Sequence, residues 1–251
     1  MKSRILVPVA TVIWISFSVH VSRAATVEVP GDVGDGLVDV NGVPVNLADP
    51  TIRPGTGGGP SASVVRGQAG IFFFQLPTIS PSTITSADVQ LAFLGFDGSP
   101  EFNLDVFGLG VRSSATILSS DYYAGSSANG SGALIETQFL TPNAIPGNFD
   151  IGLGSYLQTL YDPSGTPLGP FLVLRVNPDL PLPEPSAPSR GYVLATADNP
   201  DSSLVPQLLI TTVPEPSSII VAAAAGISFL VVGLIRGEIT FRASRTERKG
   251  I

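Results

Sequence analysis

Short segments in which apolar and polar side chains alternate, separated by glycine and proline, are the feature that most limits how this chain can fold. In residues 86–93, Val89 and Leu91 fall on one face and Asp88 falls on the other. Residues 101–107 repeat the pattern. Because successive side chains of a strand point to opposite faces, a period of two predicts strands with one buried and one wet face.

The same reasoning predicts many more strands and very little helix. Strands are expected at 70–76, 133–140, 170–177, 191–196 and 205–212, with weaker ones near 37–47. One short helix is expected at 154–161, and loops are expected at the glycine- or proline-rich segments 50–62 and 177–190. Short strands without alternating helices predict an all-β fold, a single antiparallel β-sandwich of the jelly-roll type over residues 25–212.

The C-terminal region contains three parts in succession. The motif Val213-Pro214-Glu215-Pro216 comes first. Residues 217–235 then carry no charge and would span roughly 28 Å as a helix, about one hydrocarbon thickness, so a transmembrane helix is expected over 218–235. The remaining residues, 236–251, are rich in cations, namely Arg236, Arg242, Arg245, Arg248 and Lys249. Such an excess marks the cytoplasmic side of a membrane helix.

This arrangement over residues 213–251 resembles the PEP-CTERM sorting signal of Gram-negative bacteria, in which a Pro-Glu-Pro motif precedes one membrane helix and a basic end. The resemblance implies that an exosortase recognises the motif and removes the tail. The protein would then be held in the inner membrane as a precursor and afterwards reach the cell surface or the extracellular matrix. A plain C-terminal membrane anchor is the alternative.

The N-terminus is typical of a secretory signal peptide over residues 1–24. Lys2 and Arg4 form a positive start, residues 5–19 are mostly apolar, and Ser22 and Ala24 supply the small side chains that signal peptidase reads. Cleavage is therefore expected after Ala24, and a retained N-terminal anchor is the alternative. The segment between the two terminal signals would be exported.

The composition of the exported segment excludes several classes of function. Its sequence has no cysteine, histidine, tryptophan or lysine, which rules out Ser-His-Asp and Cys-His catalysis, Schiff-base chemistry and histidine or cysteine zinc sites. We therefore expect no enzymatic activity. Between Glu28 and Glu215 the sequence has eighteen acidic residues and only five arginines. Nucleic acid is therefore an unfavourable partner, because binding its phosphates needs a basic surface.

A second resemblance concerns the exported segment. Residues 69–77 are similar to the phenylalanine-rich strand followed by Leu-Pro that opens DNRLRE-type extracellular domains, and residues 84–91 are similar to the strand that follows it. The elements at 154–161, 171–175 and 205–210 occur in the same order as in that family. The resemblance implies a jelly-roll sandwich like that of carbohydrate-binding modules, with an extracellular polysaccharide as its ligand.

Two groups of side chains are candidate ligand sites. Asp121, Tyr122 and Tyr123 precede a glycine- and serine-rich segment, where a tyrosine ring could stack on a sugar and the acid could accept its hydroxyls; half-buried packing is the alternative. In residues 31–42, here called the acidic turn, Asp32, Asp35 and Asp39 could bind Ca²⁺. The spacing departs from an EF-hand loop, so an acidic turn between two strands is the alternative.

The carboxylates Glu101 and Asp105 are expected on the wet face of a strand, too far apart for glycoside hydrolysis. The sequence thus favours a non-enzymatic protein of the bacterial envelope or exopolysaccharide matrix. A carbohydrate-binding module is the second hypothesis. The expected partners are signal peptidase, exosortase, the inner membrane and, for the second hypothesis, an extracellular polysaccharide.

Overall fold

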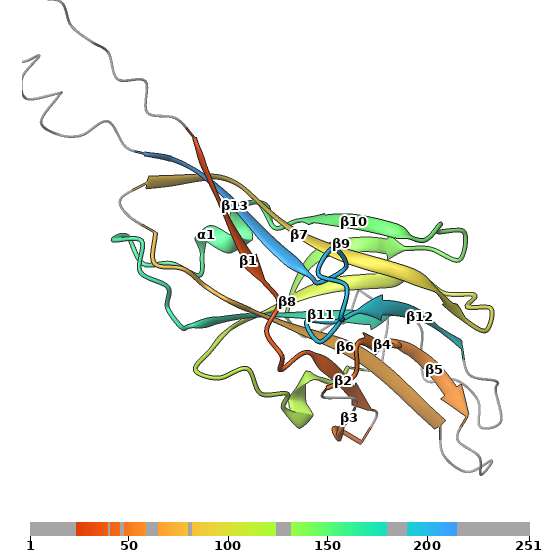
Figure 1. Cartoon of the computed structure of the whole chain (residues 1–251). Coiled ribbons are helices and arrows are strands. Elements are labelled where there is room, and N and C mark those ends of the chain that lie inside the picture. The colour runs from red at the N-terminus through yellow and green to blue at the C-terminus, as the bar shows by residue number, and fades with distance from the viewer. Residues whose placement is uncertain are drawn as a thin grey trace, which may run out of the picture.

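The computed structural model describes residues 24–39, 41–45, 48–58, 65–79, 82–123, 132–179 and 190–214. The described part of the chain is all-β, as the alternating segments predict, with one short α-helix and one 3-10 turn (Figure 1). The strands are β1 Ala25–Pro30, β2 Gly36–Asp39, β3 Pro44–Val45, β4 Thr51–Ile52, β5 Gly55–Gly58, β6 Val65–Gln75, β7 Ser82–Asp97, β8 Leu104–Arg112, β9 Ala133–Leu140, β10 Gly147–Gly152, β11 Phe171–Pro178, β12 Arg190–Ala195 and β13 Gln207–Pro214. The helices are η1 Ser119–Asp121 and α1 Gly154–Gln158.

All of these strands belong to one antiparallel sheet. Its main path runs β1-β13-β7-β12-β5-β6-β11-β8-β9, while β10 pairs with β7, β4 with β12, and β2 with both β6 and β3. The two longest strands each serve several partners: β7 pairs with β13, β10 and β12, and β6 pairs with β5, β2 and β11. A strand with partners on both edges lies in the interior of a sheet, so β6 and β7 are the two long interior strands of this sheet.

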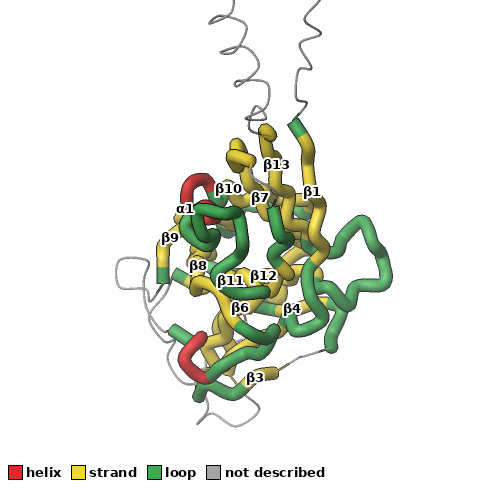
Figure 2. Tube along the Cα trace, turned by 90° about the vertical axis from the view of Figure 1, so that its left-hand side faces the viewer, coloured by secondary structure: helices red, strands yellow, loops and turns green. Residues whose placement is uncertain are grey.

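The sheet curls (Figure 2). As a result β9, at one end of the main path, lies beside β10, which branches from β7. Phe139 of β9 and Phe149 of β10, which are not paired as strands, pack edge to face with their ring centroids 6.0 Å apart. The main core lies inside this curl and includes Val89, Leu91 and Phe93 from the apolar face of β7. The alternation of residues 86–93 is therefore confirmed as a strand with one face in the core.

A second, smaller core lies on the opposite face of β6. Phe72 and Phe74 point into the main core, whereas Ile71 and Phe73 pack with Ile117 in the smaller one. Because both faces of the strand are covered, its sequence is a continuous apolar run with no alternation. The smaller core is the layer that positions the loop carrying η1.

Most of the expected strands are confirmed, together with the short helix. The helix is shorter than expected and ends at Gln158, and its Tyr156 lies across β8. A Cβ on Gly108 would lie only 2.1 Å from Cζ of that ring, so β8 needs glycine there. The Tyr156 hydroxyl accepts a hydrogen bond from the Gly110 backbone N–H at 2.8 Å.

The prediction that residues 50–62 form a loop is wrong for their first part, because β4 and β5 lie there. Both strands pair with β12, which is far away in the sequence. A Cβ on Gly55 would lie 2.2 Å from the carbonyl oxygen of Arg190, so the glycines that suggested a loop instead permit close approach of two backbones.

Candidate functional site

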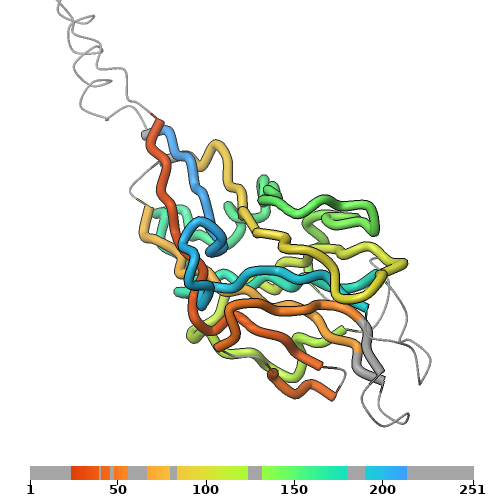
Figure 3. The backbone as a smooth tube through the Cα atoms, turned by 45° about the vertical axis from the view of Figure 1, so that its right-hand side comes forward, coloured from red at the N-terminus to blue at the C-terminus, as the bar shows by residue number. Residues whose placement is uncertain are grey.

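The first and last strands of the described chain form one pair. β1 and β13 are antiparallel, with Ala25 opposite Thr212 and Pro30 opposite Gln207. Figure 3 shows these strands, red and blue, side by side at one end of the molecule. Ala24, the residue expected before the signal-peptidase cut, is exposed. The chain therefore enters and leaves the fold at the same place.

The sorting motif begins inside the sheet. β13 continues through Val213 and Pro214, which lie opposite Thr83 and Ser82 of β7. Ser22, Glu215, Pro216, the expected helix at 218–235 and the basic residues of 236–251 lie outside the described residues. In the part of the chain that is described, no helix is long and apolar enough to cross a membrane.

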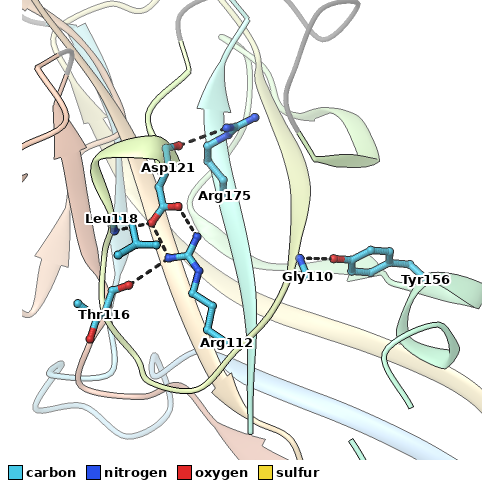
Figure 4. Close-up of polar contacts among 7 residues, drawn as sticks. All are labelled: Gly110, Arg112, Thr116, Leu118, Asp121, Tyr156 and Arg175. Atoms are coloured by element: carbon cyan, nitrogen blue, oxygen red, sulfur yellow. Dashed lines mark hydrogen bonds and ion pairs between the residues drawn. The ribbon is translucent and has the colours of Figure 1, made fainter. Parts of the chain in front are cut away.

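The second candidate group is built around a buried carboxylate. Asp121, at the end of η1, is 1% exposed. Its two carboxylate oxygens accept hydrogen bonds from both terminal nitrogens of Arg112, and Oδ2 also accepts from the Leu118 N–H at 2.8 Å (Figure 4). The same guanidinium donates to the Thr116 carbonyl at 3.0 Å. Asp121 therefore ties the loop after β8 back onto that strand.

A fully buried arginine lies beside this pair. The Arg175 guanidinium lies 4.7 Å from the ring centroid of Phe107 and 5.3 Å from that of Tyr123, and its Nη1 donates to the Asp121 backbone carbonyl at 3.2 Å. Burial lowers the pKa of Arg175 to about 10, against the opposing influence of the Asp121 charge. The side chain still carries its proton at neutral pH.

The structure thus brings Asp121, Tyr122 and Tyr123 together, but in unequal roles. Both rings are half-buried. Burial, followed by the nearby charge of Asp39, raises the pKa of Tyr122 to about 12, so its hydroxyl is neutral at physiological pH. Asp121 holds the loop, and both of its oxygens are already engaged by Arg112. Tyr122 packs against the smaller core and Tyr123 against the Arg175 guanidinium, and both tyrosines remain partly exposed.

Sequence reasoning missed Arg112 and Arg175 as parts of this cluster. A signal was present for the second, because Arg175 interrupts the apolar run of β11 and an arginine there must find partners when the strand is buried on both faces. No comparable local signal marks Arg112, since its partner follows nine residues later through an irregular loop.

Only residues 31–35 of the acidic turn, with Asp32 and Asp35, lie between β1 and β2; Asp39 is the last residue of β2 itself. Asp35 is buried, and its oxygens accept from the backbone N–H groups of Phe73, at 2.7 Å, and Ala197, at 3.3 Å. Burial raises the pKa of Asp35 well above its ordinary range; the two N–H groups oppose the rise, and the charges of Asp32 and Asp198 add to it.

The other two acids of the turn support local backbone. Asp32 accepts from the Gly34 N–H at 3.0 Å, and Asp39 accepts from those of Asn41 and Val43, each at 2.9 Å. Among the described side chains, no group of three acids is arranged to hold a metal ion. Calcium binding by Asp32, Asp35 and Asp39 stays a prediction.

The expectation that Asp105 lies on a wet strand face is wrong. It is 1% exposed on β8, and its Oδ1 accepts from the Gln138 N–H at 2.8 Å, where the pairing of β8 with β9 is irregular. Glu101 precedes β8 and forms an ion pair with Arg190 at 3.0 Å. Phe107, on the same face of β8, is also buried and lies against the Arg175 guanidinium, so this face is covered where the local pattern assigns it to solvent.

No protein-family model matches the chain, and no curated protein matches it either.

Proposed function

We propose that this chain is a non-enzymatic protein of the bacterial envelope or exopolysaccharide matrix, exported by its signal peptide and sorted through its C-terminal region by an exosortase. The pairing of β1 with β13 is the observation that carries the proposal, because it places Ala25 opposite Thr212. Both predicted membrane segments would then connect to the same end of the fold. A precursor anchored at either or both ends could fold without crossing its own connections.

The short distance between fold and membrane fits the same picture. Three residues separate Pro214 from Ser218, where the predicted transmembrane helix begins. Four Cα–Cα steps span at most about 14 Å. The folded part of a membrane-bound precursor would therefore stand directly on the outer surface of the inner membrane, with the strand pair β1–β13 at its base.

The roles of the buried carboxylates support an absence of catalysis. Asp35, Asp105 and Asp121 each accept hydrogen bonds from backbone N–H groups, and Asp121 also binds Arg112. Each of these buried acids has a structural role, because each stabilises a turn, a loop or an irregular strand pair. We also propose that the curled sheet is a jelly-roll-like β-sandwich, because the main core lies between its two halves.

Carbohydrate binding is the second candidate. The half-buried Tyr122, which packs against the smaller core, and the half-buried Tyr123, which lies against the Arg175 guanidinium, are the observation in its favour. Affinity electrophoresis against extracellular polysaccharides tests it with Tyr122→Ala and, as a matched control that keeps the ring, Tyr122→Phe. Retardation that disappears in the alanine variant alone supports a sugar site; equal migration of both variants and the wild type counts against it.

Replacing Pro214–Pro216 with three alanines tests the sorting proposal in the native host. We expect this variant to stay in the inner membrane with its tail attached. Changing Ser217 and Ser218 to alanine alters the same stretch of chain without touching the motif, and should leave sorting unchanged. If the motif variant is processed and located like the wild type, the exosortase proposal fails.

A further inference from the structure

The outer edge of β1 has no strand paired with it. β1 is the first strand of the sheet path, and its partner is β13. Five of its six residues are exposed, and the remaining one, Val29, packs against the main core. β6 reaches this edge only beyond the end of β1, through the bridge between Gly31 and Phe74. Among the described residues, the edge from Ala25 to Val29 is therefore open (Figure 3).

Two hydrogen bonds show which backbone groups point out of this edge. In an antiparallel pair, alternate residues exchange bonds with the partner strand, and the residues between them point the other way. The Gly31 N–H donates to the carbonyl just before β13, and the Asp32 N–H donates to the Phe73 carbonyl on the β6 side, both at 2.8 Å. When this alternation is followed back along β1, the N–H and C=O groups of Thr26 and Glu28 point out of the open edge.

These groups fit the same edge of a second copy of the chain. When two β1 strands lie antiparallel about a two-fold axis at Val27, Thr26 of each copy lies opposite Glu28 of the other. Each such pair exchanges two backbone hydrogen bonds, so the two strands gain four. A threonine hydroxyl then lies beside each carboxylate. Pro30, which has no N–H to donate, stays outside the overlap of residues 25–29.

Other registers of the same two strands are less favourable. An axis at Glu28 would place two carboxylates directly opposite each other, which is destabilising. An axis at Thr26 would form only two of the four hydrogen bonds within β1. The axis at Val27 is therefore the register that the edge supports best, and it brings together the two Val27 side chains, each 37% exposed in the single chain.

We propose that β1 is a self-association edge, through which two copies of this chain join their sheets antiparallel about Val27. A stable interface of standard size buries roughly 1,200–2,000 Å². One short strand edge offers less than this, so the dimer is weak and its population depends on concentration. The pairing requires neither export nor sorting, so it goes beyond the proposed function and stands or falls independently of it.

Single cysteines test the register, because the chain contains no cysteine of its own. At the axis the two Val27 residues form a non-hydrogen-bonded pair with Cα atoms about 4.5 Å apart, within the range that a disulfide spans. The two Thr26 residues lie about 9 Å apart, beyond that range. In the full chain, purified in detergent and treated with a mild oxidant, Val27→Cys should form a disulfide-linked dimer, whereas Thr26→Cys should stay monomeric.

A proline variant tests the backbone hydrogen bonds themselves. Because the Thr26 N–H points away from β13, Thr26→Pro removes a donor of the dimer without removing a hydrogen bond of the fold. In the Val27→Cys background this change should abolish the disulfide-linked dimer, and Thr26→Ser, which keeps the N–H, should preserve it. If protease sensitivity shows that Thr26→Pro unfolds the chain, Glu28→Pro removes the other outward donor and takes its place.

Three results would overturn the proposal. The first is a Val27→Cys chain that stays monomeric throughout a concentration series. The second is a Thr26→Cys chain that is linked as fast as Val27→Cys, because random collision or another register would then explain the disulfide. The third is linkage of Val27→Cys at an unchanged rate when a folded proline variant removes the outward N–H.

Discussion

Replacing the buried carboxylate of Asp121 with an amide should destabilise the fold strongly. Asp121 accepts three hydrogen bonds, two from Arg112 and one from the Leu118 N–H. Asparagine keeps one acceptor oxygen and turns an NH₂ group toward the guanidinium, so at least one charged hydrogen bond is lost and a like donor faces the arginine. The loop that carries η1 would lose its main tie to β8.

The size of the effect follows from burial. Removing one partner of a buried ion pair costs about 3–5 kcal/mol, and a hydrogen bond to a charged group contributes about 1.5–3 kcal/mol. The Arg112 side chain is 17% exposed, so water can partly solvate it after the change. We therefore expect a loss near the lower limit, about 3 kcal/mol for Asp121→Asn.

Urea unfolding of residues 25–214 measures this loss. With a slope of about 2–3 kcal/mol per molar urea, the midpoint should fall by about 1 M. Asp201→Asn is the matched control, because Asp201 also accepts bonds from a neighbouring serine, the Ser203 N–H at 3.0 Å and hydroxyl at 2.7 Å, but is exposed. Equal shifts in the two variants, or no shift in Asp121→Asn, would refute the structural role. Loss of polysaccharide binding at unchanged stability would instead make Asp121 a direct ligand.

Three further predictions concern packing, pH and calcium. Gly108→Ala should cost about 1–3 kcal/mol, because its Cβ would collide with Tyr156, whereas Gly147→Ala, with nothing within 4 Å, should be nearly neutral in the same urea experiment. Burial raises the pKa of Asp35, so the folded state binds the proton of this carboxyl group more tightly than the unfolded state does. The stability gained from that proton is complete below the ordinary aspartate pKa. It is lost as the pH rises through the pKa that Asp35 has in the folded state. Stability measured in chelator should therefore fall less between about pH 4 and pH 8 in Asp35→Asn than in the wild type, and parallel curves would contradict this. If the acidic turn binds Ca²⁺, the folded state gains about 2.7 kcal/mol at a hundred times the dissociation constant; equal melting temperatures in millimolar Ca²⁺ and in chelator, at matched ionic strength, would exclude it.

The strands could be predicted where local sequence determines which side of the strand is buried. Val89 and Leu91 alternate with polar residues because β7 has one face in the core, so a period of two is enough to identify it. The glycine-rich residues of β5 carry no such pattern. Their strand exists because β12 and β6 approach their backbone from distant parts of the chain, which no local window contains.

The candidate site could be predicted only in part for the same reason. Asp121, Tyr122 and Tyr123 do lie together, yet the role of the acid depends on Arg112, which reaches it across an irregular loop. Asp105 sits in a strand that alternates clearly, but it is buried beside Gln138 of β9, and Phe107 on the same face is buried against Arg175. Charge and periodicity identify residue types on a face, and tertiary contacts decide whether that face meets water.

Intact-mass spectrometry of the protein extracted from the surface of its native host tests the central claim most directly. The account predicts a chain that begins at Ala25 and ends close to Pro214–Pro216, without the peptide that contains Phe241. A surface form that still carries that peptide, or that still begins before Ala25, would contradict export and sorting as proposed here.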